Sequence, residues 1–173
     1  MPVIVKIRSM KKFVSLTSFL VVLLLWINKT EAQDTASNPE QFKLMQAWIG
    51  TWQQKLNKDT VEVWKIKQYG NSFTMDVSRE TKGKKVHLRK NDYTFSPEEG
   101  KFIGFQVYYN GSYDTWIGSF TSEKKFSLEI TKNFTPGSTI YKYEMVMESP
   151  ASFTLTRFEK GIKGKDLRFT KGK

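Results

Sequence analysis

The sequence has no cysteine and a single histidine, His87. Without cysteine the chain can form no disulfide, carry no lipid on an N-terminal cysteine and use no thiol as a nucleophile, so packing alone must stabilise it. A zinc site would need three carboxylates, and the nearest approach to such a cluster is Glu98-Glu99 in an expected turn. His87 lies in the phase opposite to Val86 and Leu88, which is typical of a surface position on a strand. We therefore expect no metal site.

The motifs of common catalytic and cofactor sites are also missing. The sequence contains no Gly-x-Ser-x-Gly turn, no Walker loop and no glycine-rich dinucleotide turn. Glu62, Asp76 and Glu144 alternate with apolar residues and are expected to face outward, so no pair of catalytic carboxylates is indicated. The sequence therefore predicts a protein that is not an enzyme and binds no cofactor.

The one long apolar run lies at the N-terminus. A basic segment, 6–12, precedes the apolar segment 13–27, after which the sequence becomes polar. This order is typical of a secretory signal peptide, and we expect cleavage after Ala32. A retained anchor helix is the alternative, but 15 apolar residues are fewer than the roughly 20 that span a bilayer. The predicted organisation is a signal peptide at 1–32, a disordered leader at 33–38 and one domain at 39–173.

Basic residues outnumber acidic ones, and the formal net charge is +11. Without residues 1–32 the chain keeps 23 basic and 16 acidic residues, a charge of +7. Such a surface favours anionic partners through a field that salt screens within about 10 Å. The basic residues are nevertheless spread along the chain, with local density only at 82–85 and 160–173, so no specific nucleic-acid groove is predicted.

The hydrophobic period of the sequence changes at Gly50. Apolar residues recur at helical spacing before it, which predicts a helix at 40–49. Asn110-Gly111 is the strongest hairpin signal beyond it, because both central positions of a type I′ turn need positive φ. Short alternating segments separated by turn residues predict strands at 51–56, 61–68, 72–80, 85–95, 101–109, 113–121, 125–134, 139–148, 153–159 and 165–170.

The short connections between these segments make neighbours in sequence neighbours in space, which predicts an antiparallel meander. Ten meandering strands leave two unpaired edges unless the sheet closes, and unpaired edges promote aggregation. The predicted fold class is therefore all-β, an antiparallel meander β-barrel of eight to ten strands with the short helix capping one end. A two-sheet sandwich is the alternative, but it usually needs a long Greek-key connection, which the sequence does not contain. We expect a monomer.

Alternation within the strands indicates which side chains point into the barrel. The segment 102–109 is apolar in both phases, so we expect one of its sides to lie under the N-terminal helix. Five other segments have one apolar phase each, and the residues in these phases are Phe73, Met75 and Val77; Trp116, Gly118 and Phe120; Phe126, Leu128 and Ile130; Tyr141, Tyr143, Met145 and Met147; and Phe153 and Leu155.

The segment Gly50-Thr51-Trp52 opens the first strand, after a short helix and ahead of the ten-segment meander. This arrangement resembles the lipocalin and calycin superfamily, whose shared signature is Gly-x-Trp, and in particular its exported bacterial lipocalin-like domains of unknown function. The resemblance implies that Trp52 packs across the closed end of the barrel. It also implies an arginine over the indole ring, either Arg157 or Arg168, in a contact worth on the order of 1 kcal/mol.

Arg157 extends the inward phase of Phe153 and Leu155, where an unpaired guanidinium is unfavourable. Two interpretations are open. The arginine stacks on Trp52, or it faces a cavity and binds a ligand carboxylate together with Tyr143, as a resemblance to small fatty-acid-binding barrels implies. Aromatic and methionine side chains would complete the lining of such a pocket, and the candidates are Phe73, Met75, Trp116 and Met145.

The predicted function is that of a secreted lipocalin-like protein that binds a small apolar or amphiphilic ligand, including an anionic one. The alternative is a barrel without an internal ligand that binds an envelope surface or a macromolecule through its basic exterior. In both cases we expect an exported protein, periplasmic or extracellular, with no transmembrane segment after cleavage.

Overall fold

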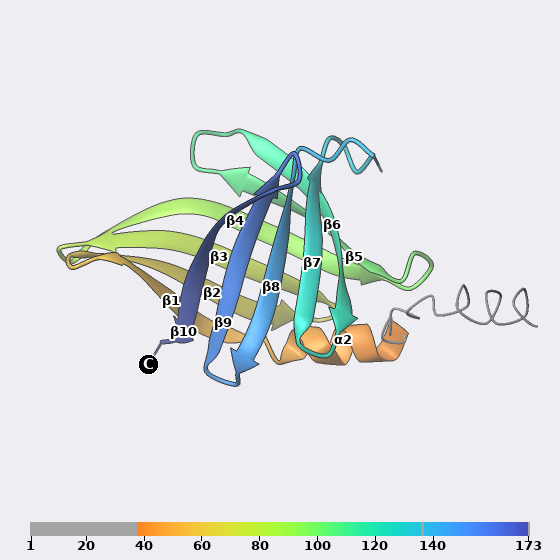
Figure 1. Ribbon diagram of the computed structural model, residues 1–173, viewed down its shortest axis with the longest axis horizontal. Helices are drawn as coiled ribbons and strands as arrows, with labels where there is room; N and C mark the ends of the chain where they lie inside the picture. The colour runs from red at the N-terminus through yellow and green to blue at the C-terminus, as the bar shows by residue number, and fades with distance from the viewer. Residues whose placement is uncertain (1–37, 136, 173) are drawn as a thin grey trace, which may run out of the picture. The chain divides into compact units, whose positions relative to one another are not determined.

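The computed structural model describes residues 38–135 and 137–172, which belong to one compact unit, Asp34–Lys173. The expected signal peptide and residues 33–37 of the expected leader lie outside the described residues. No helix within the described ranges is long and apolar enough to cross a membrane. The elements in chain order (Figure 1) are α2 (Asn38–Gln46), β1 (Gly50–Asn57), β2 (Thr60–Tyr69), β3 (Ser72–Thr81), β4 (Lys84–Ser96), β5 (Lys101–Tyr108), β6 (Tyr113–Ser122), β7 (Lys125–Thr131), β8 (Tyr141–Ser149), β9 (Ser152–Glu159) and β10 (Ile162–Lys171).

The ten strands form one closed antiparallel barrel. Each strand pairs with its neighbours in sequence, and β1 pairs with β10 to close the sheet. Trp52 of β1 lies opposite Trp64 of β2 on one side and opposite Lys171 of β10 on the other. The predicted all-β meander barrel is therefore confirmed, and the two-sheet sandwich is excluded.

The connections between strands alternate between the two ends of the barrel. The β2–β3, β4–β5, β6–β7 and β8–β9 connections lie at the end where α2 packs, which we call the helix end. The β1–β2, β3–β4, β5–β6, β7–β8 and β9–β10 connections lie at the opposite end, which we call the open end. In Figure 1 these five connections extend to the left and to the top.

The Asn110-Gly111 hairpin is present, but its turn is longer than predicted. β5 ends at Tyr108 and β6 begins at Tyr113. Within this connection only Gly111 has a positive φ, 83°, whereas a type I′ turn needs two such residues. Asn110 Oδ1 accepts hydrogen bonds from Ser112 N at 3.0 Å and from Ser112 Oγ at 2.7 Å, which stabilises the longer connection. The prediction of a type I′ turn is wrong.

Helix α2 is held to the barrel by the buried side chain of Gln41. Gln41 Nε2 donates to Phe120 O at 2.9 Å, and Gln41 Oε1 accepts from Phe120 N at 2.7 Å. At this end of the sheet the pairing of β5 with β6 stops at Phe102 and Gly118. Because β5 begins at Lys101, it has no residue opposite Phe120. The Gln41 amide takes the place of that missing strand partner, because it satisfies both backbone groups of Phe120.

The core at the helix end is aromatic. The helix ends at Gln46, three residues earlier than predicted, and tight turns follow, with Trp48 N donating to Met45 O at 3.0 Å. Trp52 is fully buried, and its Nε1 donates to Trp48 O at 2.8 Å. The rings of Trp48 and Trp52 each lie 5.0 Å from the ring of Phe153. Trp52 thus packs across the helix end of the barrel.

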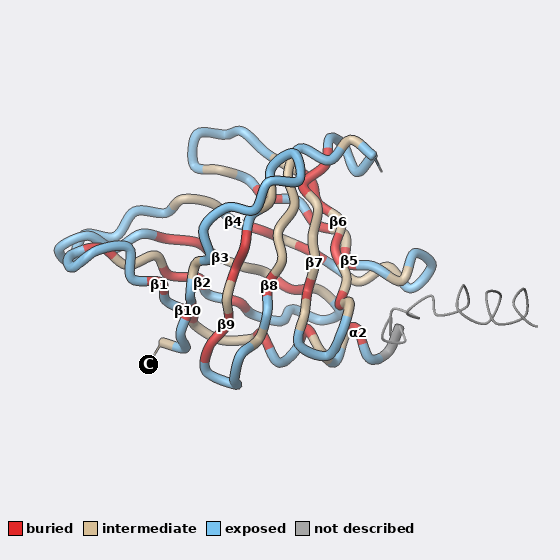
Figure 2. The backbone as a smooth tube through the Cα atoms, viewed as in Figure 1, coloured by how far each residue is buried: buried red, intermediate tan, exposed pale blue. Residues whose placement is uncertain are grey.

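The predicted inward phases are confirmed, since their residues are buried or pack against the buried core. Figure 2 shows buried segments along the strands and exposed residues at the tips of the hairpins. The expectation that α2 covers one side of 102–109 is wrong. The outward side chains of this strand, Phe105 and Val107, are exposed, as is the following Tyr109. The helix instead contacts β6 at the barrel end.

Candidate ligand-binding cavity

A cavity of about 260 Å³ lies inside the barrel, lined by side chains of β2 to β10. Towards α2 lies a void of about 40 Å³ that shares Met75, Trp116 and Met145 with the larger cavity and ends on Trp48. Five of the six predicted ligand-binding residues line the cavity, namely Met75, Trp116, Tyr143, Met145 and Arg157. The sixth, Phe73, does not. It is fully buried in the aromatic core, with its ring 5.1 Å from that of Phe42 in α2.

Arg89 also lines the cavity, and simple alternation does not place it there. Counting from Val86 and Leu88 would put Arg89 beside His87 on the outer face. In the structure Arg89 pairs with Val77 and His87 pairs with the next residue of β3, so Leu88 is an extra residue in β4. Such a bulge reverses the side-chain phase. It turns Arg89 inward.

The guanidinium of Arg89 has no anionic partner. Arg89 forms no hydrogen bond and no ion pair with any residue in the described ranges, and its Nε is buried. Its Cζ lies 5.7 Å from the ring centroid of Trp64, a contact worth about 0.5 to 2 kcal/mol. That gain does not replace a hydrogen-bonded counter-charge. Each of the other three described arginines pairs with a carboxylate, in the pairs Arg79–Glu62 at 3.4 Å, Arg157–Glu159 at 2.9 Å and Arg168–Glu148 at 3.3 Å.

Glu62 lines the cavity as well, so the expectation that it faces outward is wrong. It lies two residues before Trp64 and shares the inward phase of that side chain. Its Oε1 accepts a hydrogen bond from Trp64 Nε1 at 2.9 Å, and its Oε2 faces Arg79. Glu62 is therefore already neutralised by its own partners, and Arg89 provides the uncompensated charge of the cavity wall.

A second cluster of polar side chains, from β5, β6 and β8, lies beside the cavity. Asp114 Oδ2 accepts hydrogen bonds from Tyr108 Oη at 2.8 Å, from Gln106 Nε2 at 3.1 Å and from Tyr141 Oη at 3.3 Å. Burial raises the pKa of Tyr108 and of Tyr141, so both hydroxyls stay protonated and donate to Asp114. Asp114 is thus satisfied by three donors.

Tyr143 faces the cavity next to these charges. Burial, the largest cause, raises the pKa of its hydroxyl, while the positive charges of Arg89 and Arg157 act in the opposite direction. Arg157 is the register partner of Tyr143 between β8 and β9, and Arg89 lines the same cavity. Asn91 and Gln106, which the sequence patterns did not single out, add two buried amides to the same wall. The guanidinium of Arg89 remains available to an anionic group, whereas both N–H groups of Gln106 Nε2 already donate, to Tyr108 Oη at 2.7 Å and to Asp114 Oδ2 at 3.1 Å.

Arg157 lies at the rim of the cavity. Its side chain is 48% exposed, pairs with Glu159 and places its Cζ 4.3 Å from the ring centroid of Tyr141. It also lines a surface hollow with Lys160 of the β9–β10 connection and Ile162, the first residue of β10, so the cavity opens toward the open end. Arg157 is an exposed rim residue, whereas Arg89 reaches the interior.

The expected arginine on Trp52 is replaced by a lysine. Lys171 of β10 places its Nζ 5.1 Å from the ring centroid of Trp52, whereas Arg157 and Arg168 pair with carboxylates elsewhere. Gly50 makes room for the lysine, since a Cβ at this position would lie 3.1 Å from Lys171 Cε. Gly50 also has a φ of 138°, which residues with side chains rarely adopt. The Gly-x-Trp segment therefore has a structural role here.

Within residues 38–172, as far as they are described, no three or more His, Asp or Glu side chains gather in a way that could hold a metal ion. The expectation that the protein needs no cofactor stays a prediction. A scan of the sequence against models of known protein families finds no match, and neither does a search among curated proteins. The closed ten-strand meander is consistent with a lipocalin-like fold.

Proposed function

We propose that this protein is a lipocalin-like binding protein that holds a compact amphiphilic anion inside its barrel, with the anionic group on Arg89. The unpartnered guanidinium in the cavity wall carries the proposal. A buried charged donor without a partner is unfavourable, and a carboxylate can accept from two guanidinium nitrogens at once. Ligand binding would therefore supply the interaction that the protein alone leaves unmade.

The rest of the cavity suits the apolar part of such a ligand. Trp116, Met145 and Leu155 line it, and methionine adapts to irregular apolar shapes. A cavity of about 150 Å³ accommodates benzene, so about 260 Å³ has room for roughly ten non-hydrogen atoms. This volume is slightly below the range of typical ligand pockets, roughly 300 to 1,000 Å³. We infer a medium-chain or single-ring carboxylate rather than a long-chain lipid.

We further propose that the protein acts after export, as a periplasmic or extracellular carrier or sensor and not as an enzyme. The basic and apolar segments at 6–27 support export. The absence of known catalytic motifs from the sequence supports a binding role.

A displacement titration tests the binding role. The protein is loaded with an anionic fluorescent dye, which is then displaced by octanoate or by octanol, a neutral molecule of the same length. We expect octanoate to bind the wild type, and Arg89→Met to weaken it by about 2 to 5 kcal/mol, the range for truncating one partner of a buried charged pair. Octanol should bind both proteins equally.

Arg157→Met is the matched control, since it removes an arginine from the exposed rim of the same cavity. Exposed ion pairs contribute about 0 to 1 kcal/mol, so this variant should keep most of the octanoate affinity. Equal loss in Arg89→Met and Arg157→Met would place the anion at the rim and contradict the proposed site. Tighter binding of hexadecanoate than of octanoate would contradict the inferred ligand size.

A further inference from the structure

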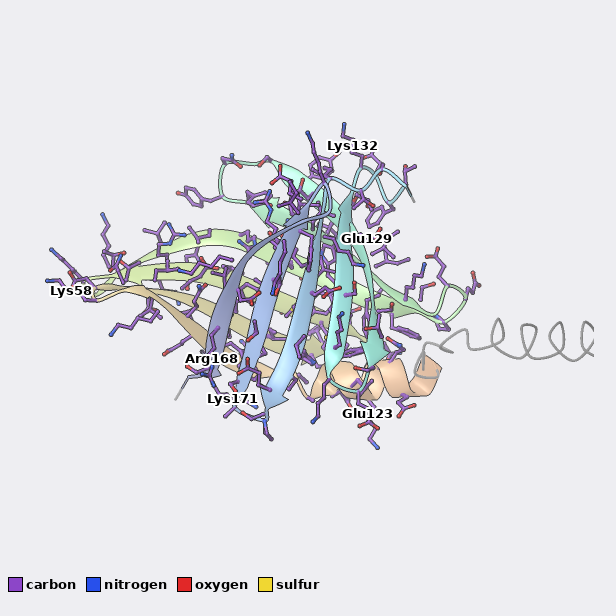
Figure 3. All side chains as sticks on the ribbon, in the orientation of Figure 1. Lys58, Glu123, Glu129, Lys132, Arg168 and Lys171 are labelled. Atoms are coloured by element: carbon purple, nitrogen blue, oxygen red, sulfur yellow. The ribbon has the colours of Figure 1, made fainter. Side chains whose placement is uncertain are left out.

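The two ends of the barrel differ in charge. At the open end, the residues between strands include Lys58, Lys82, Lys132 and Lys160, against one acidic residue, Asp59. At the helix end, the residues between strands include Glu98, Glu99 and Glu123, against Lys124 alone. Figure 3 shows Lys58 and Lys132 at the tips of the open end and Glu123 beside α2. The four open-end lysines are exposed and form no ion pair with any described residue, so their charge is available to a partner.

Large apolar side chains are exposed at the same open end. Tyr109 is 84% exposed and Tyr113 62% exposed in and beside the β5–β6 connection. Ile162, at the start of β10, is 74% exposed. The β7–β8 connection adds Phe134 and Ile140, which are about two-fifths exposed. In a meander, successive connections at one end lie two strands apart, roughly 10 Å, so these residues lie on three neighbouring connections along one side of the mouth.

We propose that the open end docks on an anionic lipid surface. Lysines near an anionic bilayer are attracted to it, and tyrosine is enriched at membrane interfaces, where its ring is apolar and its hydroxyl is hydrated. Ile162 and Ile140 have neither a ring to stack on a base nor a polar group to bind a sugar. A bilayer is the partner that uses the lysines and the apolar side chains together.

Docking in this orientation points the cavity mouth at the bilayer. Arg157 lines both the internal cavity and the hollow of the β9–β10 connection, which also contains Lys160 and Ile162. An amphiphilic ligand could then pass between bilayer and barrel without crossing bulk water. This consequence rests on the proposed ligand-binding function. Docking itself does not, because it depends on exterior side chains only.

Vesicle co-sedimentation tests the docking. The chain from Asp34 onward is used, because this compact unit contains the whole barrel and its core, and because the apolar segment 13–27 would bind vesicles by itself. We expect binding to vesicles of phosphatidylcholine mixed with phosphatidylglycerol, and little binding to phosphatidylcholine alone. Raising the salt concentration should weaken it. Lys160→Gln and Lys58→Gln should each lower the partition coefficient about five-fold.

Matched variants at the helix end distinguish docking through the open end from nonspecific binding of exposed side chains to vesicles. Tyr109→Ser and Ile162→Ser should lower vesicle binding several-fold, whereas Tyr69→Ser should not, although Tyr69 is 82% exposed. Lys124→Gln is the corresponding control for Lys160→Gln. These changes affect exposed side chains, so each should leave the urea unfolding midpoint nearly unchanged.

Three outcomes would overturn the proposal. The first is equal binding to neutral and anionic vesicles, and the second is an equal loss in Tyr69→Ser and Tyr109→Ser. The third is binding to a soluble sulfated polysaccharide as tight as to vesicles and unaffected by Tyr109→Ser, which would identify a polyanion rather than a bilayer as the partner. Vesicle binding that survives Arg89→Met, whatever the result with octanoate, would show that docking and ligand binding are independent.

Discussion

Replacing Gln41 by methionine should weaken the attachment of the helix to the barrel. The substitution keeps a long unbranched side chain of similar helix propensity but removes both hydrogen bonds to Phe120. A buried backbone group without a partner costs about 1 to 3 kcal/mol, so the loss of two gives about 2 to 6 kcal/mol. Water entering beside α2 would form part of the missing hydrogen bonds. We therefore expect the free energy of unfolding to fall by about 2 to 4 kcal/mol.

Gln46→Met is the matched control, with the same substitution in the same helix. Gln46 Nε2 donates to Gln68 Oε1 at 3.1 Å, but this hydrogen bond is exposed, so its loss should cost less than about 0.5 kcal/mol. Equilibrium unfolding in urea measures both values, and hydrogen exchange at the Phe120 amide should become faster in Gln41→Met only. If the two variants lose equal stability, the Gln41 amide does not replace a strand partner.

Three further predictions concern the core. Trp52→Ala should lower the free energy of unfolding in urea by about 3 to 5 kcal/mol, because the ring is fully buried. A loss below about 1 kcal/mol would contradict a structural role for this ring. Gly104→Ala should cost about 1 to 3 kcal/mol, since its Cβ would lie 2.5 Å from the ring of Trp116; unchanged stability would show that this ring moves freely. Burial raises the pKa of Tyr93, so the unfolded chain loses this proton near pH 10 while the folded protein keeps it. Stability should therefore be complete below about pH 10 and fall above it, and Tyr93→Phe should reduce that fall; identical alkaline profiles would contradict the assigned burial effect.

Much of the fold can be predicted from the alternation of apolar and polar residues along the strands. Inward residues such as Phe73, Trp116 and Phe126 recur with period two between short turns, and this pattern leaves few arrangements other than a meander that closes. Trp52 at the closed end follows from the same reasoning with the Gly-x-Trp signature. The aromatic and methionine part of the cavity is predictable for the same reason, because apolar side chains on one phase share one interior.

The polar part of the cavity could not be predicted in this way. Arg89 faces inward because Leu88 is an extra residue in β4. The signal for this bulge is the change of the apolar phase from Val86 and Leu88 to Tyr93 and Phe95. Glu62 shares the inward phase of Trp64, and its carboxylate is accommodated there because Trp64 Nε1 and, from the neighbouring strand β3, Arg79 satisfy it. The lysine on Trp52 comes from β10, at the far end of the sequence, and depends on how the barrel closes.

The Nε of Arg89 gives the most direct test of the proposed function. In a ¹H–¹⁵N spectrum of the protein, its cross-peak can be assigned by its loss in Arg89→Met. We predict that octanoate shifts this peak in a saturable titration, that octanol leaves it in place, and that the Nε peak of Arg157 moves little with either. An Arg89 peak that stays unchanged while other cavity residues respond to octanoate would show that the anion binds elsewhere, and would contradict the account.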